Sequence, residues 1–391
     1  MISFWEQSSF FKYDTIIVGS GIVGLSMAAS ILEKDPDNRV LILERSVVLG
    51  GASTKNAGFA CVGTPSETLW DLRELGREGC FNLINMRYKG LQRLRQRLGD
   101  DKIGYKQVGG HELIGEDGLH YLKELDKLNE LFKPIFGGPP YEIANHKIDE
   151  FGFNKDKVKA LVYNKYEGHI DTGKTISNLI QYVQKLGARI LAGAEVVDYV
   201  KIDSHKVCVK VKNPLKQPET YDFHAKSLVL CTNEYSNKFI KNCGIVPGRG
   251  QVLITKPIPN LKVKGIFQFD QGFYYFRDHE NRIIFGGGRN LDLEGEQTYE
   301  MKTTPKIMNN LKKLLKEVIL PGVDFEIESE WAGIMAFGEK ERAPLIDSLD
   351  ENIFAAVRMG GMGVAISSYA GDIIAEKLLK QQKEVAVRPS L

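Results

Sequence analysis

The segment DTIIVGSGIVGLSMA, residues 14–28, constrains the fold more than any other part of this chain. An apolar run at residues 15–18 leads into Gly19, Gly21 and Gly24, and small residues with a helical pattern follow. This G-x-G-x-x-G spacing is typical of the turn between a strand and a helix that holds the pyrophosphate of a dinucleotide. The first glycine permits the tight turn, the second lets the backbone approach the phosphates, and the third lets helix and strand pack closely.

A second apolar run, RVLILE, is typical of a buried parallel strand and ends in Glu44. A carboxylate at this place accepts hydrogen bonds from the ribose hydroxyls, while the N-terminus of the preceding helix attracts the phosphates. Glu44 opposes a 2′-phosphate at the same hydroxyls. Its neighbour Arg45 can either attract such a phosphate or pack over the adenine. The motif by itself leaves FAD and NAD open.

The following segment, LGGASTKNAGFACVG at residues 49–63, favours FAD. It is rich in glycine, small residues and hydroxyls, and it stands where an NAD-binding domain normally continues into another helix. Small side chains let consecutive backbone N–H groups lie along a long flat ligand.

With these segments the chain resembles the D-amino-acid-oxidase-like family of FAD-dependent oxidoreductases, which includes glycine oxidase, sarcosine oxidase and gamma-glutamylputrescine oxidase. The most specific matches are DTIIVGSGIVGL, GASTKNAG and FAAVRMGGMGVAISSYAGDIIAE. LILER, GAEVVDY, SLVLCTNEYS, GRGQVLIT, RIIFGGGR and WAGIMAF support them in the family's order. The resemblance implies an α/β fold, with a discontinuous Rossmann-like FAD-binding domain and a strand-rich α+β substrate domain.

The α/β segments come in three separated pieces, which predicts where the domains divide. We expect the FAD-binding domain at residues 12–85, 151–245 and 329–385, and the substrate domain at 86–150 and 246–328. Helical patterns predict helices at 22–34, 69–99, 117–133, 304–319 and 366–380.

The resemblance also implies a set of FAD contacts. Val197 would pair with the adenine through its backbone, and Ser53 would contact phosphate or ribityl. The N–H groups of Gly361, Met362 and Gly363 would face the flavin where negative charge collects on reduction. The full implied set is Gly19, Gly21, Ile22, Val23, Gly24, Glu44, Arg45, Gly51, Ala52, Ser53, Lys55, Asn56, Ala57, Gly58, Val197, Thr232, Asn233, Gly360, Gly361, Met362, Gly363, Val364 and Ala365.

Candidate substrate residues come from the strand-rich part of the chain. Tyr274 and Tyr275 match a family strand that faces the flavin, and strand alternation lets only one of them point inward. Arg277, Arg289 and Arg249 are candidate carboxylate clamps, because the guanidinium fork matches a carboxylate.

The chain departs from the family at several positions. Met335 stands where glycine-oxidase-like members carry an arginine, and Ala365 and Ile284 stand where sarcosine-oxidase-like members carry lysines. No cysteine occurs at residues 332–336, where some members tether the flavin. These departures predict non-covalent FAD, and a larger or less carboxylate-dependent substrate or an acceptor other than oxygen.

Composition excludes several other classes of protein. The net charge is +2 without a concentrated basic face, which gives no support for nucleic-acid binding. The five cysteines form no C-x-x-C and no histidine-linked zinc spacing, so we expect no metal and a reducing, cytoplasmic compartment. The N-terminal residues lack a secretory pattern, and the apolar stretch at 16–30 is too short to span a bilayer. The sequence leaves the oligomeric state open.

We therefore expect an FAD-dependent oxidase or dehydrogenase. It would oxidise the C–N bond of an amine or N-substituted amino acid by hydride transfer to flavin N5, with oxygen or a quinone-type acceptor. A 2-hydroxy-acid or polyol dehydrogenase passing electrons to quinone is the alternative. A flavin-binding module that modifies RNA or serves as an assembly partner would need a basic patch or an added domain, and the sequence supplies neither.

Overall fold

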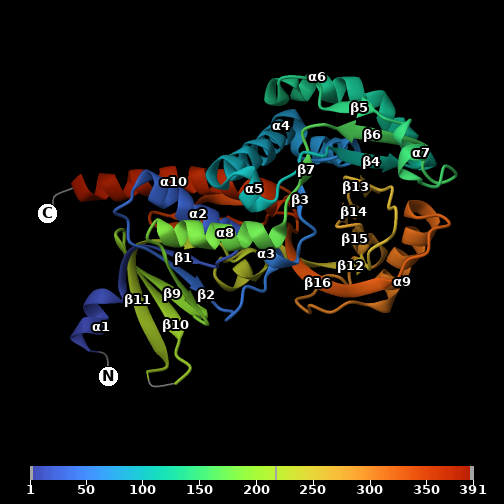
Figure 1. Cartoon of the computed structure of the whole chain (residues 1–391). Coiled ribbons are helices and arrows are strands. Elements are labelled where there is room, and N and C mark those ends of the chain that lie inside the picture. The colour runs from blue at the N-terminus through green and yellow to red at the C-terminus, as the bar shows by residue number, and fades with distance from the viewer. Residues whose placement is uncertain (1–2, 216–217, 388–391) are drawn as a thin grey trace.

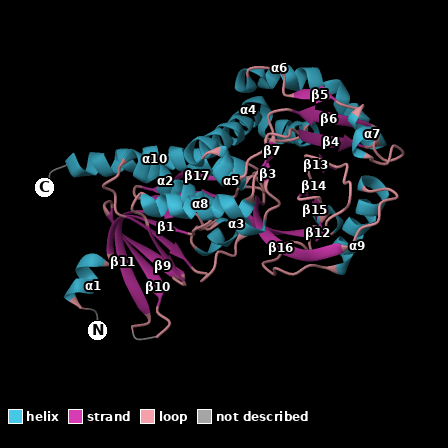
Figure 2. Cartoon of the chain, in the orientation of Figure 1, coloured by secondary structure: helices cyan, strands magenta, loops and turns pink. Residues whose placement is uncertain are grey.

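The computed structural model describes residues 3–215 and 218–387, and most of its strands gather in two separate eight-stranded sheets (Figure 2). The first sheet has the order β17-β18-β11-β1-β2-β8, and β9 and β10 extend it from β11. β1 pairs in parallel with β2 and β11, and β18 pairs in parallel with β11. Its strands are β1 (Lys12–Val18), β2 (Val40–Glu44), β8 (Arg189–Ala192), β9 (Val196–Asp203), β10 (Lys206–Lys212), β11 (Thr220–Leu230), β17 (Leu345–Asp350) and β18 (Ile353–Val357).

Three helices lie side by side along the parallel part of this sheet: α2 (Ile22–Lys34), α8 (Thr172–Lys185) and α10 (Gly363–Val387) (Figure 1). α2 is buried along almost its whole length because it lies between the sheet and α10. The two helices approach closely at Gly371, where an added Cβ would lie 2.7 Å from the carbonyl oxygen of Ser26. Burial on all sides explains why the sequence of α2 is apolar and small on every face.

The second sheet has the order β16-β12-β15-β14-β13-β4-β6-β5. Its pairs are antiparallel except for β13 with β4. Phe267, Phe276 and Phe285 form an aromatic core on one face. The strands are β4 (Gly110–Ile114), β5 (Tyr141–Ile143), β6 (Ala160–Asn164), β12 (Ile245–Thr255), β13 (Ile266–Phe269), β14 (Tyr274–His279), β15 (Arg282–Gly287) and β16 (Ile327–Gly338).

Several predicted helices differ from the structure at their ends. α4 (Pro65–Leu98) begins four residues before the predicted start at 69, because Thr64 caps it through Glu67 N–H and Pro65 suits its first position. The single helix predicted at 117–133 is wrong: a 3₁₀ segment, η1 (Glu116–Glu124), precedes α6 (Leu125–Phe136). The helix predicted at 304–319 is α9 (Pro305–Leu314) followed by a π turn, η4 (Leu315–Ile319).

Short elements complete the chain. β6, within the segment 151–245 expected to bind FAD, pairs with β4 and β5 of the second sheet. In the described ranges no helix is both long and apolar enough to cross a membrane. The short elements are α1 (Phe4–Ser9), α3 (Ala52–Lys55), α5 (Asp100–Ile103), α7 (Lys147–Phe151), β3 (Phe59–Ala60), β7 (Gly168–His169), η2 (Asn233–Lys238) and η3 (Arg289–Leu291).

Candidate active site

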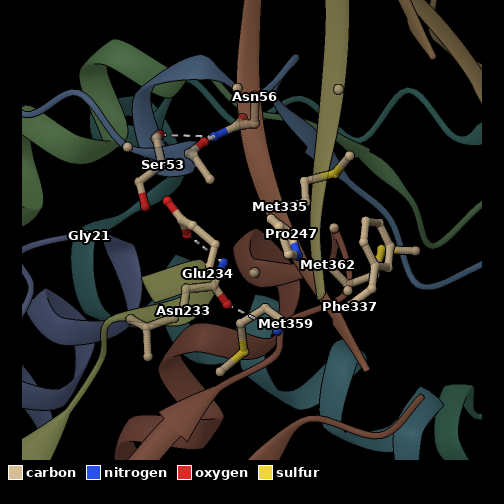
Figure 3. Close-up of a pocket in the computed structure, with 18 of the residues that line it drawn as sticks. Gly21, Ser53, Asn56, Asn233, Glu234, Pro247, Met335, Phe337, Met359 and Met362 are labelled. Carbon is tan, nitrogen blue, oxygen red and sulfur yellow. Dashed lines mark hydrogen bonds between the residues drawn. The ribbon is translucent and has the colours of Figure 1, made fainter. Parts of the chain in front are cut away.

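A cavity of about 990 Å³ runs from the carboxyl ends of β1 and β2 to the second sheet. Small-molecule sites usually measure about 300–1,000 Å³, so this cavity suits a large ligand. Figure 3 shows Ser53 beside Gly21 on one side of the cavity, and Met335, Met362 and Phe337 on the other.

The glycine turn forms an anion cradle at the first end. Gly19 has φ +102°, and a Cβ there would lie 2.6 Å from the carbonyl oxygen of Cys231. Gly21 is the N-cap of α2, and the N–H of Ile22 donates to Ser53 Oγ at 2.9 Å. Among the described residues, the N–H groups of Gly21 and Val23 have no hydrogen-bond acceptor. Unpaired N–H groups at a helix N-terminus are what a phosphate needs, so this end fits a pyrophosphate.

Glu44 lies beside the cradle and lines the cavity. Its Oε2 accepts hydrogen bonds from the N–H and hydroxyl of Ser20, at 3.0 and 2.8 Å, and its Oε1 accepts one from the N–H of Ser46 at 2.9 Å. A carboxylate offers about four acceptor sites, so one remains for a ribose hydroxyl. The Arg45 guanidinium packs over the ring of Tyr235, 3.7 Å from its centroid.

The backbone of residues 52–58 forms the middle wall, and side chains behind it fix its position. The Nδ2 of Asn56 donates to the carbonyl oxygen of Ser53, and its Oδ1 accepts from the N–H of Gly58, both at 2.9 Å. Trp331 Nε1 donates to the carbonyl oxygen of Lys55 at 2.9 Å. A wall of fixed backbone is suited to a flat ring system.

The start of α10 borders the cavity. Gly360 and Gly361 have φ of +56° and +82°, which favours glycine at both positions. Asn233 Oδ1 accepts a hydrogen bond from the N–H of Met359 at 3.3 Å and ties this turn to η2 (Figure 3). The first amides of α10, from Gly363 on, therefore start at the cavity.

Most residues of the expected FAD set line this cavity. Gly24, Gly58, Val197 and Ala365 do not. A Cβ at Gly24 would overlap the carbonyl oxygen of Gly19, so this glycine serves packing. Strand alternation places the side chain of Val196 rather than that of Val197 at the cavity, and the backbone contact expected of Val197 stays a prediction. Lining residues that the sequence reasoning missed include Ala194, Val196, Glu234, Tyr235, Pro247, Phe337 and Met359.

Of the two tyrosines, Tyr275 lines the cavity and Tyr274 points to the opposite face of the sheet. The Tyr274 hydroxyl accepts a hydrogen bond from Asn310 Nδ2 at 3.1 Å. The Tyr275 hydroxyl has no hydrogen-bond partner within the described ranges, and burial raises the pKa of Tyr275 to about 12. Tyr275 is therefore a neutral donor or acceptor at the cavity wall.

The three arginine candidates have different surroundings. Arg289 lines the cavity, packs 4.1 Å from the ring centroid of Phe337, and has no ion pair with a described residue. Arg277 lies outside the cavity, donates to the carbonyl oxygens of Gly58 and Ile170, and has its pKa lowered by burial to about 10. Arg249 also lies outside and pairs with Glu296 at 2.7 Å. Of these three arginines, Arg289 alone lines the cavity without an ion pair to a described residue.

The first turns of α4 form a further wall that sequence reasoning missed. Glu67, Trp70 and Asp71 line the cavity from this helix, together with Arg87 from farther along it. The helical pattern at 69–99 predicted the helix, but it carried no signal for which residues would face a ligand.

Glu167 lies behind this wall, and its burial has a consequence for stability. Its Oε1 accepts from the N–H groups of Val62 and Gly63, at 2.8 and 3.1 Å, and burial raises its pKa from 4.5 to about 7. Between about pH 4.5 and 7 the folded state binds more protons than the unfolded state. The contribution of the Glu167 carboxyl group to the stability of the folded protein is therefore lost as the pH rises.

We expect Glu167→Gln to raise the thermal midpoint Tm more at pH 8 than at pH 5. Glutamine keeps one oxygen to accept both N–H groups and removes the buried charge. Calorimetry of both proteins at the two pH values measures the difference. An equal effect at both pH values, or a lower Tm of the variant at pH 8, would contradict this assignment.

The comparisons with known proteins agree with this geometry. The family described as FAD dependent oxidoreductase matches residues 14–377. The chain belongs to this family, and it is an FAD-dependent oxidase or dehydrogenase.

Individual relatives are distant but cover most of the chain. A probable oxidoreductase, OrdL, of Haemophilus influenzae is 23% identical over 96% of this chain and 84% of its own length. Gamma-glutamylputrescine oxidoreductase of Escherichia coli is 23% identical over 93% of this chain and 83% of its own. The crystal structure of L-proline dehydrogenase from P. horikoshii has a TM-score of 0.77 at 18% identity, covering 95% of this chain and 94% of that one. The last likeness concerns the fold.

Proposed function

We propose that this protein oxidises the C–N bond of an amine or N-substituted amino acid, using non-covalently bound FAD. The observation that carries the proposal is that Tyr275 and Arg289 occur together at the wall of one cavity. Both side chains line the same cavity as the glycine turn. Neither the Tyr275 hydroxyl nor the Arg289 guanidinium forms a hydrogen bond or ion pair with a described residue. The gamma-glutamylputrescine oxidoreductase named above adds support, because its name describes an amine as substrate.

In this proposal the two sheets have different roles. The first sheet and its helices would hold FAD through the α2 N-terminus, Glu44 and residues 52–58, and the second sheet would face the substrate. When bound, FAD supplies an acceptor for a hydride from the substrate carbon. The α10 N-terminus offers its dipole and its first N–H groups to negative charge at the cavity.

The protein's own side chains would bind and orient the substrate. Arg289 would receive a carboxylate, for which its planar fork is suited. The Tyr275 hydroxyl would donate a hydrogen bond beside it. Met335, Phe337 and Met362 are apolar lining residues and would exclude water from the reacting carbon. A substrate amine that binds neutral needs no side-chain base.

The proposal that FAD is bound non-covalently rests on the positions and the reactivity of the cysteines. None occurs at residues 332–336. Cys61 lines the cavity, but burial raises the pKa of its thiol well above the ordinary value, so it stays an unreactive thiol.

The test starts with the purified yellow protein. We expect denaturation to release free FAD, and anaerobic addition of amines or N-substituted amino acids to bleach the flavin. Repeating the assay with oxygen and with a quinone or dye identifies the acceptor. Bleaching by 2-hydroxy acids or polyols alone would favour the alternative dehydrogenase, and flavin that stays attached to peptide would contradict non-covalent binding.

Glu44→Ala should weaken FAD binding roughly tenfold or more, since a charge-assisted hydrogen bond contributes about 1.5–3 kcal/mol. The structure adds a second effect, because Glu44 also holds Ser20 and Ser46. We therefore expect a lower Tm of the apoprotein as well. Fluorescence titration of apoprotein with FAD measures the first effect and calorimetry the second. An unchanged FAD affinity would show that Glu44 is not the ribose ligand.

A further inference from the structure

The wall formed by α4 carries a hydrogen-bond acceptor that no described residue satisfies. Glu67 is 8% exposed and lines the cavity, yet no described residue donates a hydrogen bond to its carboxylate. Its nearest cation is Arg87, whose Nη2 lies 3.5 Å away. A buried carboxylate without donors is costly, so a ligand that supplies donors would bind here favourably.

Arg87 does not neutralise Glu67 alone. The same Nη2 lies 3.4 Å from Asp71, and Nη1 donates to the carbonyl oxygen of Val62 at 2.9 Å. Asp71 in turn accepts from Arg342 Nε at 3.0 Å, and its Oδ2 is buried without a hydrogen bond. One guanidinium is thus divided among three acceptors.

The surroundings of Glu67 contain a further surplus of acceptors. Gln268 lines the same cavity and its Oε1 is buried without a donor. Glu112 and Glu167 are buried nearby, and burial together with the charge of Glu67 raises the pKa of each to about 7. This end of the cavity is rich in hydrogen-bond acceptors and carboxyl groups, which suits a cation that carries several N–H donors.

Glu67 and Arg289 both lie close to residues 272–273. A Cβ at Gly272 would lie 3.6 Å from Glu67 Oε2, and the next residue, Phe273, has its ring centroid 5.6 Å from the Arg289 guanidinium. Among the described residues, the cavity thus presents a guanidinium without an ion pair and a carboxyl group without a hydrogen-bond donor near residues 272–273. A ligand with a carboxylate and a separate ammonium group matches both.

We propose that Glu67 is a specificity residue that binds a second, cationic group of the substrate, remote from the carbon that is oxidised. The inference rests on the function proposed above. The reacting amine must be neutral to lose a hydride, and a carboxylate beside it would keep it protonated. Glu67 therefore suits an ammonium that stays charged. The substrate class is a diamino acid or another amino compound with a distal ammonium group.

Matched probe pairs test this inference: lysine against norleucine, in both enantiomers, and 1,5-diaminopentane against hexylamine. The members of each pair have similar length and differ in a distal ammonium group. Anaerobic flavin bleaching gives the reduction rate, and absorbance titration gives the affinity. We expect the cationic member to be favoured roughly tenfold or more in the wild-type protein, as one charge-assisted contact provides.

Glu67→Gln should remove this preference mainly through KM, leave the apolar member unchanged, and retain FAD. Glu67→Asp keeps the charge and should keep part of the preference. Glu78→Gln is the matched control, because Glu78 is exposed in α4, beyond the kink at Gly76 that separates it from Glu67, and does not line the cavity.

Equal reduction by both members, or a preference that survives Glu67→Gln, would overturn the inference while leaving the proposed function intact. Should the glutamine variant fail to fold, the wild-type preference and the aspartate variant decide. If no amine reduces the flavin at all, the proposed function is wrong, and the role of Glu67 falls with it.

Discussion

Gly21→Val is expected to give a folded but colourless protein. Gly21 has φ −65°, an ordinary conformation for valine, and an added Cβ meets only the movable Ser53 side chain, at 2.9 Å. The new side chain would fill the space in front of the α2 N-terminus, where the phosphates are expected. Loss of two charge-assisted hydrogen bonds of about 1.5–3 kcal/mol each lowers FAD affinity roughly a hundredfold or more.

The matched control is Gly115→Val. Gly115 also has a negative φ, −83°, and an added Cβ would meet only the carbonyl oxygen of Lys157 at 3.6 Å, outside the main cavity. Flavin content after purification and FAD titration of the apoprotein compare the two variants. Normal flavin content in a folded Gly21→Val protein would show that the phosphates lie elsewhere.

Arg289→Met is expected to lower kcat/KM for a substrate with a carboxylate by roughly a hundredfold or more, because two charge-assisted hydrogen bonds are lost. Methionine keeps apolar contact with Phe337 and Phe273 but removes the charge. An amine without a carboxylate should be affected far less. This difference separates a lost clamp from a disturbed cavity.

Arg282→Met serves as its control. This variant makes the same substitution at a residue of β15. Arg282 pairs with Glu328 at 2.8 Å and does not line the cavity. Anaerobic reduction rates of both variants, with and without a carboxylate on the substrate, give the comparison. Equal losses for both substrate types in Arg289→Met would contradict the clamp.

The sequence by itself determined the arrangement of the cavity end where we expect the cofactor. The glycine turn, the helix that follows it and the strand that ends in Glu44 are consecutive in the chain, so local pattern and spacing predict their arrangement. For α10 the helical pattern predicted a start at residue 366, whereas the helix begins at Gly363, after Gly360 and Gly361 with positive φ. Where local signals misled, at 117–133, a 3₁₀ segment had replaced part of a helix of the same periodicity.

The substrate end was decided by tertiary structure. Alternation predicted that one of Tyr274 and Tyr275 faces inward, but only the pairing of β14 with β13 and β15 selects Tyr275. Glu67, Gln268 and Arg289 are far apart in sequence and meet only because α4, β13 and η3 border one cavity. Hydrogen bonds between distant strands and packing between helix and sheet fix such neighbours, and no local pattern of residues encodes them.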